Sequence, residues 1–143
     1  MKNWKQQPCH SVLNQYIDCY WLIEKSPGDV SLDFPKLNPD PAAHFILAPA
    51  KQTFHYQYQN KTVSGSGCHL ILPNSGTLTL DHSKPFVIIG IKFRVGALYA
   101  LKGFDKLPLI NQILTESDDL PMDWLGDNSS LVQLASKPKN LVC

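Results

Sequence analysis

The sequence predicts a mainly β fold, a barrel or a sandwich, with short helices after it. The chain of 143 residues has eleven prolines and eight glycines. Most of them fall before residue 97, where they interrupt the chain too often for a long helix. β-Branched and aromatic residues cluster between these breaks, as they do in strands. The spacing of the apolar residues becomes helical only after Arg94.

Apolar and polar residues alternate in three segments, residues 17–24, 30–34 and 53–59, which predicts half-buried strands. Pro35 ends the second of these strands or places it at a sheet edge. The short apolar run at residues 44–48 predicts a fourth strand. We expect this strand to pair with residues 53–59 as a hairpin.

Two more strands are predicted over residues 69–72 and 77–80, and we expect them to form a second hairpin. Residues 86–93 are apolar with little alternation. Such a run is typical of a central strand that is covered on both faces.

Three short helices are expected after these strands. The first covers residues 97–101 and is ended by Gly103. Residues 109–114 keep helical spacing, and a last helix is predicted over residues 128–135.

Length and composition favour a single domain over residues 1–143, with a β-barrel at about 12–93 and a helical part at about 95–136. One domain usually takes ~100–200 residues, so two cores would be undersized. Hydrophobic residues make up 43% of the chain and charged residues 17%, which is enough apolar material to fold. The net charge of +1 is too small to hold a polyanion over a broad surface.

The sequence shows neither a secretory leader nor a membrane span. The positive start has no apolar stretch behind it, as a leader would need. No apolar run reaches the ~20 residues that cross a bilayer. We therefore expect a cytoplasmic protein that does not contact a membrane.

The four cysteines are expected to be reduced thiols, partly buried. Cys9, Cys19, Cys68 and Cys143 form no CxxC pair, and a cytoplasmic location disfavours disulfides. A zinc site is the less favoured alternative, since Cys-His neighbours on a strand point to opposite faces. We expect no metal and no cofactor.

Common catalytic motifs are absent, which favours a binding function over an enzyme with catalytic residues. There is no Gly-rich phosphate loop, no GxSxG elbow and no HExxH zinc motif. The histidines at positions 44, 55, 69 and 82 lie on different elements and could converge. His44 or His55 beside a carboxylate in a pocket would favour an enzyme.

Aromatic residues on alternating strand positions suggest a small-molecule pocket. Trp21, Tyr56 and Tyr58 are expected on inward faces, where a ring covers a ligand and its polar tip orients it. Core filling is the alternative for each residue alone. With His44, they are our candidates for ligand binding.

Arg94 is the fifth ligand-binding candidate, because it precedes a helix start that already carries partial positive charge. A cation there needs a partner. Either a carboxylate such as Asp40 pairs with it, which we favour, or the arginine and the helix start hold an anionic ligand.

Three blocks of the sequence resemble the N-terminal sensor domain of bacterial AraC-type transcription regulators. The first runs from Leu13 to Trp21 as L-x-x-Y-I-x-x-Y-W. The second is L-x-P-D at residues 37–40, followed by apolar residues 45–47. The third is G-I-K-F-R-x-G at residues 90–96.

Two departures from the family pattern bear on the ligand site. Pro41 stands where the second block usually has glycine, and its fixed φ prevents a turn that needs positive φ there. Val95 replaces the proline that usually precedes the glycine of the third block. The resemblance therefore implies a site with altered specificity.

The resemblance implies a cupin-like, jelly-roll β-barrel followed by short helices, then a C-terminal helix-turn-helix domain. We expect this DNA-binding domain to be absent from the chain. Contact with DNA would be made only through the absent domain. A small-molecule effector in the barrel would bias the DNA-binding part. Leu131, Leu134 and Ala135 could form a homodimer or interdomain contact.

Two alternatives remain from other functional classes. The first is a small barrel enzyme of the isomerase or epimerase type, with a histidine as general acid or base. The second is a dimerisation module without a ligand, which an interior completely filled by side chains would support.

Overall fold

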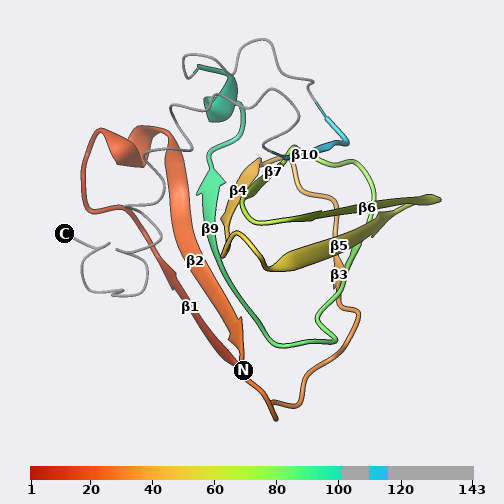
Figure 1. Cartoon of the computed structure of the whole chain (residues 1–143). Coiled ribbons are helices and arrows are strands. Elements are labelled where there is room, and N and C mark those ends of the chain that lie inside the picture. Colours follow the sequence, from red (N-terminus) through yellow and green to blue (C-terminus); the bar gives the residue numbers. More distant parts are fainter. Residues whose placement is uncertain (101–109, 116–143) are drawn as a thin grey trace.

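The computed structural model describes residues 1–100 and 110–115, which fold into two antiparallel β-sheets (Figure 1). Two short 3-10 helices, η1 (Leu13–Gln15) and η2 (Ala97–Ala100), accompany the strands. The expectation of a mainly β fold is confirmed.

The larger sheet has six strands, and β9 lies inside it between β2 and β4. In sheet order the strands are β1 (Lys2–Gln6), β2 (Ile17–Lys25), β9 (Phe86–Phe93), β4 (His44–Leu47), β7 (His69–Ile71) and β10 (Ile113–Thr115). The prediction of a central strand at residues 86–93 is confirmed, because β9 pairs along its whole length with β2 and over residues 89–92 with β4.

The smaller sheet has four strands and faces the larger one. Its order is β3 (Lys36–Leu37), β8 (Leu78–Leu80), β5 (Thr53–Tyr58) and β6 (Lys61–Ser66). In Figure 1, β5 and β6 run at a steep angle to β1, β2 and β9.

Both faces of the six-stranded sheet bury apolar side chains. On the outer face, Phe45, Leu70 and Leu72 are completely buried in a cluster that also contains Phe93 and Leu98 of η2. Burying one such side chain contributes about 1.5–3 kcal/mol. This explains why residues 86–93 lack the polar alternation of a half-buried strand.

A second apolar cluster lies between the two sheets. Ile46 and Ile71 come from the larger sheet, while Tyr56, Leu78 and Leu80 come from the smaller one. Phe54 and Tyr58 of β5 pack against the same cluster, as their shared face predicted.

Both predicted hairpins are wrong. β4 pairs with β7 and β9, whereas β5 pairs with β6 and β8. β7 and β8 lie in different sheets. The chain crosses to the other sheet after β4 and again after β7, so neither strand pairs with the strand that follows it in sequence.

The strand predicted over residues 30–34 is also absent. The apolar residues of this alternating segment are exposed, with 96% of Val30 and 72% of Leu32 accessible to solvent. Near its end, the Asp33 carbonyl oxygen accepts a hydrogen bond from the N–H of His82, two residues after β8. Alternation there does not mark a buried face.

Of the predicted helices, the first is the 3-10 helix η2, at residues 97–100. The helical spacing of residues 109–114 is misleading, because Ile113–Thr115 forms β10 and pairs with β7. The expected helix end at Gly103 and the last helix, residues 128–135, lie outside the described residues.

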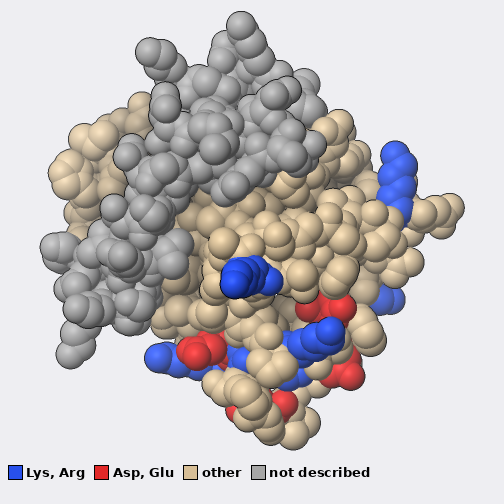
Figure 2. Space-filling view, viewed as in Figure 1, with Lys and Arg blue, Asp and Glu red and all other residues tan. Residues whose placement is uncertain are grey.

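Positive and negative side chains are interspersed on the face drawn in Figure 2, with no broad patch of either sign among the described residues. Among those residues, no helix has both the length and the hydropathy that a membrane crossing needs.

Trp21 lies flat across Gly90, its direct partner on the neighbouring strand β9. A Cβ atom built on Gly90 would overlap Cε2, Cζ2 and Nε1 of the indole. The ring can cross β9 toward β4 only because this position carries no side chain.

We predict that Gly90→Ala destabilises the fold by about 1–3 kcal/mol, the usual cost of overpacking. In the Trp21→Ala variant, which lacks the indole, Gly90→Ala should be neutral or stabilise the fold by about 0.5–1 kcal/mol, since glycine weakens a strand. Urea unfolding of Gly90→Ala, Trp21→Ala and the double variant measures the coupling. Equal costs of Gly90→Ala with and without the indole would contradict this explanation.

Candidate functional site

A cavity of about 440 Å³ lies between the two sheets. Trp21, Ile46 and Ile88 line it from the larger sheet, and Phe54 and Tyr56 line it from the smaller one. Exposed residues at the end of β3 and just after it, namely Leu37, Asn38 and Pro39, also line the cavity. The cavity is therefore an open pocket with largely apolar walls.

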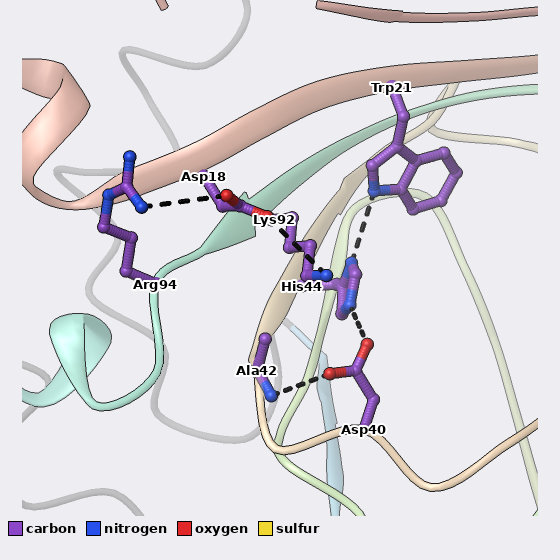
Figure 3. A network of polar contacts seen from close by, with 7 residues as sticks. All are labelled: Asp18, Trp21, Asp40, Ala42, His44, Lys92 and Arg94. Carbon is purple, nitrogen blue, oxygen red and sulfur yellow. Dashed lines mark hydrogen bonds and ion pairs between the residues drawn. The ribbon is translucent and has the colours of Figure 1, made fainter. Parts of the chain in front are cut away.

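One end of the cavity holds a chain of three side chains, Trp21, His44 and Asp40 (Figure 3). Trp21 Nε1 donates a hydrogen bond to His44 Nδ1 at 3.2 Å. His44 Nε2 lies 2.8 Å from Asp40 Oδ2. Since an indole can only donate, Nδ1 must accept, and the proton of the neutral ring sits on Nε2, facing the carboxylate.

Asp40 is held by main-chain hydrogen bonds with Ala42 and Asn74 as well as by His44. Its Oδ1 accepts a hydrogen bond from the Ala42 N–H at 2.9 Å, and its main chain exchanges two hydrogen bonds with Asn74 in an isolated bridge. The carboxylate is thus fixed in direction although 31% of the side chain is exposed.

The network favours a neutral histidine beside an ionised carboxylate. Burial lowers the pKa of His44, and this effect outweighs the opposing influence of Asp40. Burial alone would raise the pKa of Asp40, but the hydrogen bonds from Ala42 and His44 hold it below its ordinary value. Asp40 therefore carries the negative charge at this end of the cavity.

Arg94 does not reach this network. A β-bulge between Ile17 and Cys19 leaves Asp18 outside the strand register. Its Oδ1 lies 3.8 Å from Arg94 Nη1, and its Oδ2 lies 3.6 Å from Lys92 Nζ. Arg94 also donates two hydrogen bonds to Asn14. The expected structural pair with a carboxylate exists, but its partner is Asp18 and not Asp40.

The middle of the cavity wall contains a buried hydrogen-bonded pair, Tyr56 and His69. His69 Nδ1 lies 2.9 Å from the Gly67 carbonyl oxygen, so it must carry the ring proton. Tyr56 therefore donates its hydroxyl proton to Nε2. Phe54 stacks on the histidine ring, with ring centroids 3.8 Å apart. Burial lowers the pKa of His69 to about 4.

Near the first residues of β9, hydrogen bonds from two side chains, Gln52 and Lys25, hold the end of the cavity. Both amide atoms of Gln52 hydrogen-bond the backbone of Val87, each at 3.0 Å. The buried Lys25 donates a 2.6 Å hydrogen bond to the His82 carbonyl oxygen. These contacts occupy the polar atoms of Gln52 and Lys25.

Tyr58 lies outside this cavity although it shares a strand face with Tyr56. Its hydroxyl bonds Ser75 and donates to Asn111 Oδ1. It lines a separate, smaller hollow of about 280 Å³ near β10.

Of the five predicted ligand-binding residues, the structure brings three together at the cavity: Trp21, His44 and Tyr56. Tyr58 and Arg94 lie elsewhere. The sequence analysis missed the roles of Asp40 as the partner of His44 and of His69 as the partner of Tyr56. The spacing of Asp40 and His44 is the one local signal that could have indicated the first pair.

Within the described ranges, no group of three or more His, Cys, Asp or Glu side chains is placed to hold a metal ion. Asp40 and His44 supply two ligand types, but both bonding atoms of the histidine are already engaged.

We predict that stability falls as the pH falls from about 7 to about 5. The unfolded chain takes up a proton at His69 near the usual pKa of 6.5, whereas the folded protein does so only near 4. The unfolded state binds more protons in this window, so acid should cost of the order of 2 kcal/mol. Burial lowers the pKa values of His44 and His82 as well, which adds to the same trend.

Urea unfolding at both pH values measures this loss. The double variant Tyr56→Phe/His69→Phe should show a smaller loss, and His10→Gln, at an exposed position, should keep the full loss. If the double variant lost as much stability as the wild type, His69 would not be the cause.

One comparison with known proteins gives a match. A family model described as a domain of unknown function (DUF6597) matches residues 5–114. No curated protein matches the chain, and no solved structure does. The matched segment is more than half of the sequence and contains every residue of the cavity, so the chain belongs to the DUF6597 family.

Proposed function

We propose that this chain is an effector-sensing domain of the kind found in AraC-type transcription regulators, and that a small molecule binds in the cavity between its sheets. The observation that carries the proposal is the cavity. Its volume of about 440 Å³ falls within the ~300–1,000 Å³ typical of small-molecule sites.

The walls of the cavity suit a small organic ligand. Trp21, Phe54 and Tyr56 offer large aromatic surfaces, and Ile46 and Ile88 add aliphatic ones. A few fixed polar groups, above all the Asp40 carboxylate, could orient the ligand. In small-molecule sites the apolar surface usually supplies the affinity, and a few polar groups supply the specificity.

The three blocks that resemble AraC-type sensors meet at the end of the cavity where Trp21, His44 and Asp40 lie. The first contributes Trp21, the second contributes Asp40, and the third contributes Gly90, over which the indole lies. The first and third are joined again where Arg94 N–H donates to the Tyr16 carbonyl oxygen. Residues that are distant in sequence therefore share one network, as a common ligand site would require.

We also propose that the two sheets form a cupin-like barrel. The inward faces of β4, β5, β7 and β8 contribute to a single apolar cluster, and the cavity opens beside it. A cytoplasmic location, and contact with DNA through a separate domain, would accompany this function.

β9 offers a route from the cavity to an output. It passes Trp21 at Gly90 and continues through Phe93 to η2, whose Leu98 is buried in the outer cluster. Ligand binding that shifted the indole would strain this strand. A difference in ligand affinity between two packings of ~1–3 kcal/mol would suffice for a regulatory switch.

A second candidate function is catalysis, and one observation favours it. His44 lies 2.8 Å from Asp40 at the cavity, which is the arrangement of a histidine held by a carboxylate. Against it, the nitrogen that would act as a base accepts the Trp21 N–H at 3.2 Å. The ring would have to lose this bond before it could take a proton from a substrate.

The ligand-free dimerisation module has less support. It would be favoured by an interior completely filled by side chains, whereas the described residues leave about 440 Å³ open between the sheets.

We predict that a thermal-shift screen of metabolites will find a compound that raises the melting temperature with concentration, because it binds only the folded state. Trp21→Ala should weaken its affinity by about tenfold or more, equivalent to about 1.4 kcal/mol. Trp4→Ala is the matched control, since Trp4 belongs to the same sheet but packs against the outer cluster. Equal loss of affinity in both variants would remove Trp21 from the site.

We further predict that the same compound is recovered unchanged after long incubation with the protein. A sensor binds its effector without converting it, whereas an enzyme with His44 as base would release product. One-dimensional NMR of the compound with wild type and with His44→Gln decides between the two. Conversion by the wild type alone would favour the enzyme.

A further inference from the structure

We propose that the cavity, if it binds small molecules as inferred above, selects an apolar or aromatic body that carries a protonated amine, and that the amine binds at Asp40. Small carboxylates and phosphates of the same shape would be excluded.

The first argument is the charge of the lining. Among the described residues that line the cavity, the acidic ones are Asp40 and Asp81, and none is a lysine or an arginine. The pKa of Asp40 and that of Asp81 are both lowered, the latter by hydrogen bonds from Ser83. Both are therefore ionised at neutral pH, and the lining is negative.

Lysines act on these two carboxylates only from outside the lining, Lys92 on Asp40 and Lys84 on Asp81. Lys92, which influences His44, lies 3.6 Å from Asp18. The ammonium group of Lys25 is 3.8 Å from Asp33 and bonds the His82 carbonyl oxygen. Each cation thus has a carboxylate partner outside the cavity, and neither belongs to the lining.

Three of the four histidines in the wall add no compensating charge, and the fourth, His55, is exposed and shares a hydrogen bond with Ser64 Oγ. Burial lowers the pKa of His44, of His69 and of His82. The hydrogen bonds of His44 and His69 each require one protonated and one unprotonated ring nitrogen. These rings are therefore neutral when Asp40 is charged.

Asp40 retains the capacity to accept more hydrogen bonds. Its two oxygens each receive one donor, from Ala42 and from His44, whereas an ionised carboxylate has about four lone-pair sites. Acceptors outnumber donors at this end, which suits a ligand group with several N–H bonds.

The partly apolar surroundings strengthen this preference. Opposite charges attract more strongly when walls such as Trp21 and Ile71 exclude water. Aromatic walls add attraction for a cation. An anion would instead lose its hydration and meet two carboxylates, so the same walls penalise it.

Three probes that differ only in their end group test the inference: 3-phenylpropylamine, 3-phenylpropan-1-ol and 3-phenylpropanoate. Calorimetry at neutral pH and low salt gives their affinities. We expect the amine to bind about tenfold more tightly than the alcohol, as a hydrogen-bonded charge allows, and the carboxylate to bind most weakly.

Two isosteric variants locate the amine. Asp40→Asn keeps an acceptor for Ala42 and should reduce the affinity of the amine to that of the alcohol, without changing the latter. Asp81→Asn should preserve most of the preference for the amine. Melting temperatures of both variants establish that they fold.

The outcomes separate this inference from the proposed function. If the alcohol or carboxylate binds as tightly as the amine, or if only Asp81→Asn removes the preference, the inference is wrong while the cavity remains a binding site. If none of the three probes binds at millimolar concentration, cavity binding itself is contradicted, and the inference with it.

Discussion

The contact between the Trp21 indole and the backbone of Gly90 is the constraint on which the rest of the site depends. Because position 90 has no side chain, the ring lies along the sheet and crosses β9 to reach His44 on β4. That hydrogen bond selects the tautomer of His44, and the tautomer in turn directs a proton to Asp40. One missing methyl group therefore fixes the orientation of three side chains from three segments of the chain.

The same device explains why the space between the sheets stays open. In the smaller sheet, Phe54 lies over its cross-strand partner Gly65, where a Cβ would come within 2.7 Å of the ring. The Trp21 ring lies flat on its own sheet and covers apolar surface there, whereas Phe54 also stacks on His69 of the facing sheet. The core between the sheets is thereby limited to a few residues, including Ile46, Tyr56 and Leu80, and the remaining volume forms the cavity. Trp21 here forms part of the cavity wall, while Tyr56 belongs to the core between the sheets as well.

The sequence predicts what depends on local pattern and fails where distant partners decide. Residues 17–24 and 86–93 were identified as strands because alternation and its absence are read along the chain itself. Pairing could not be read in this way, since β4 and β5 are neighbours in sequence but belong to different sheets. Residues 30–34 show the opposite failure, because alternation says nothing about whether another surface covers the apolar side. Helical spacing over residues 109–114 rests on too few positions to exclude a strand.

The candidate site was predictable to a similar degree, and for the same reason. The inward direction of Trp21 and Tyr56 follows from strand periodicity, but the partner of each polar group is set by the fold. Asp40 was expected near Arg94, yet the β-bulge at Asp18 gives the arginine a closer carboxylate and leaves Asp40 to His44. As a consequence, Arg94, the arginine predicted for the ligand site, lies outside the cavity, and the ionised Asp40 belongs to its lining. The bulge on β2 thus places Asp18 beside Arg94, and a ligand in the cavity would meet the negative charge of Asp40.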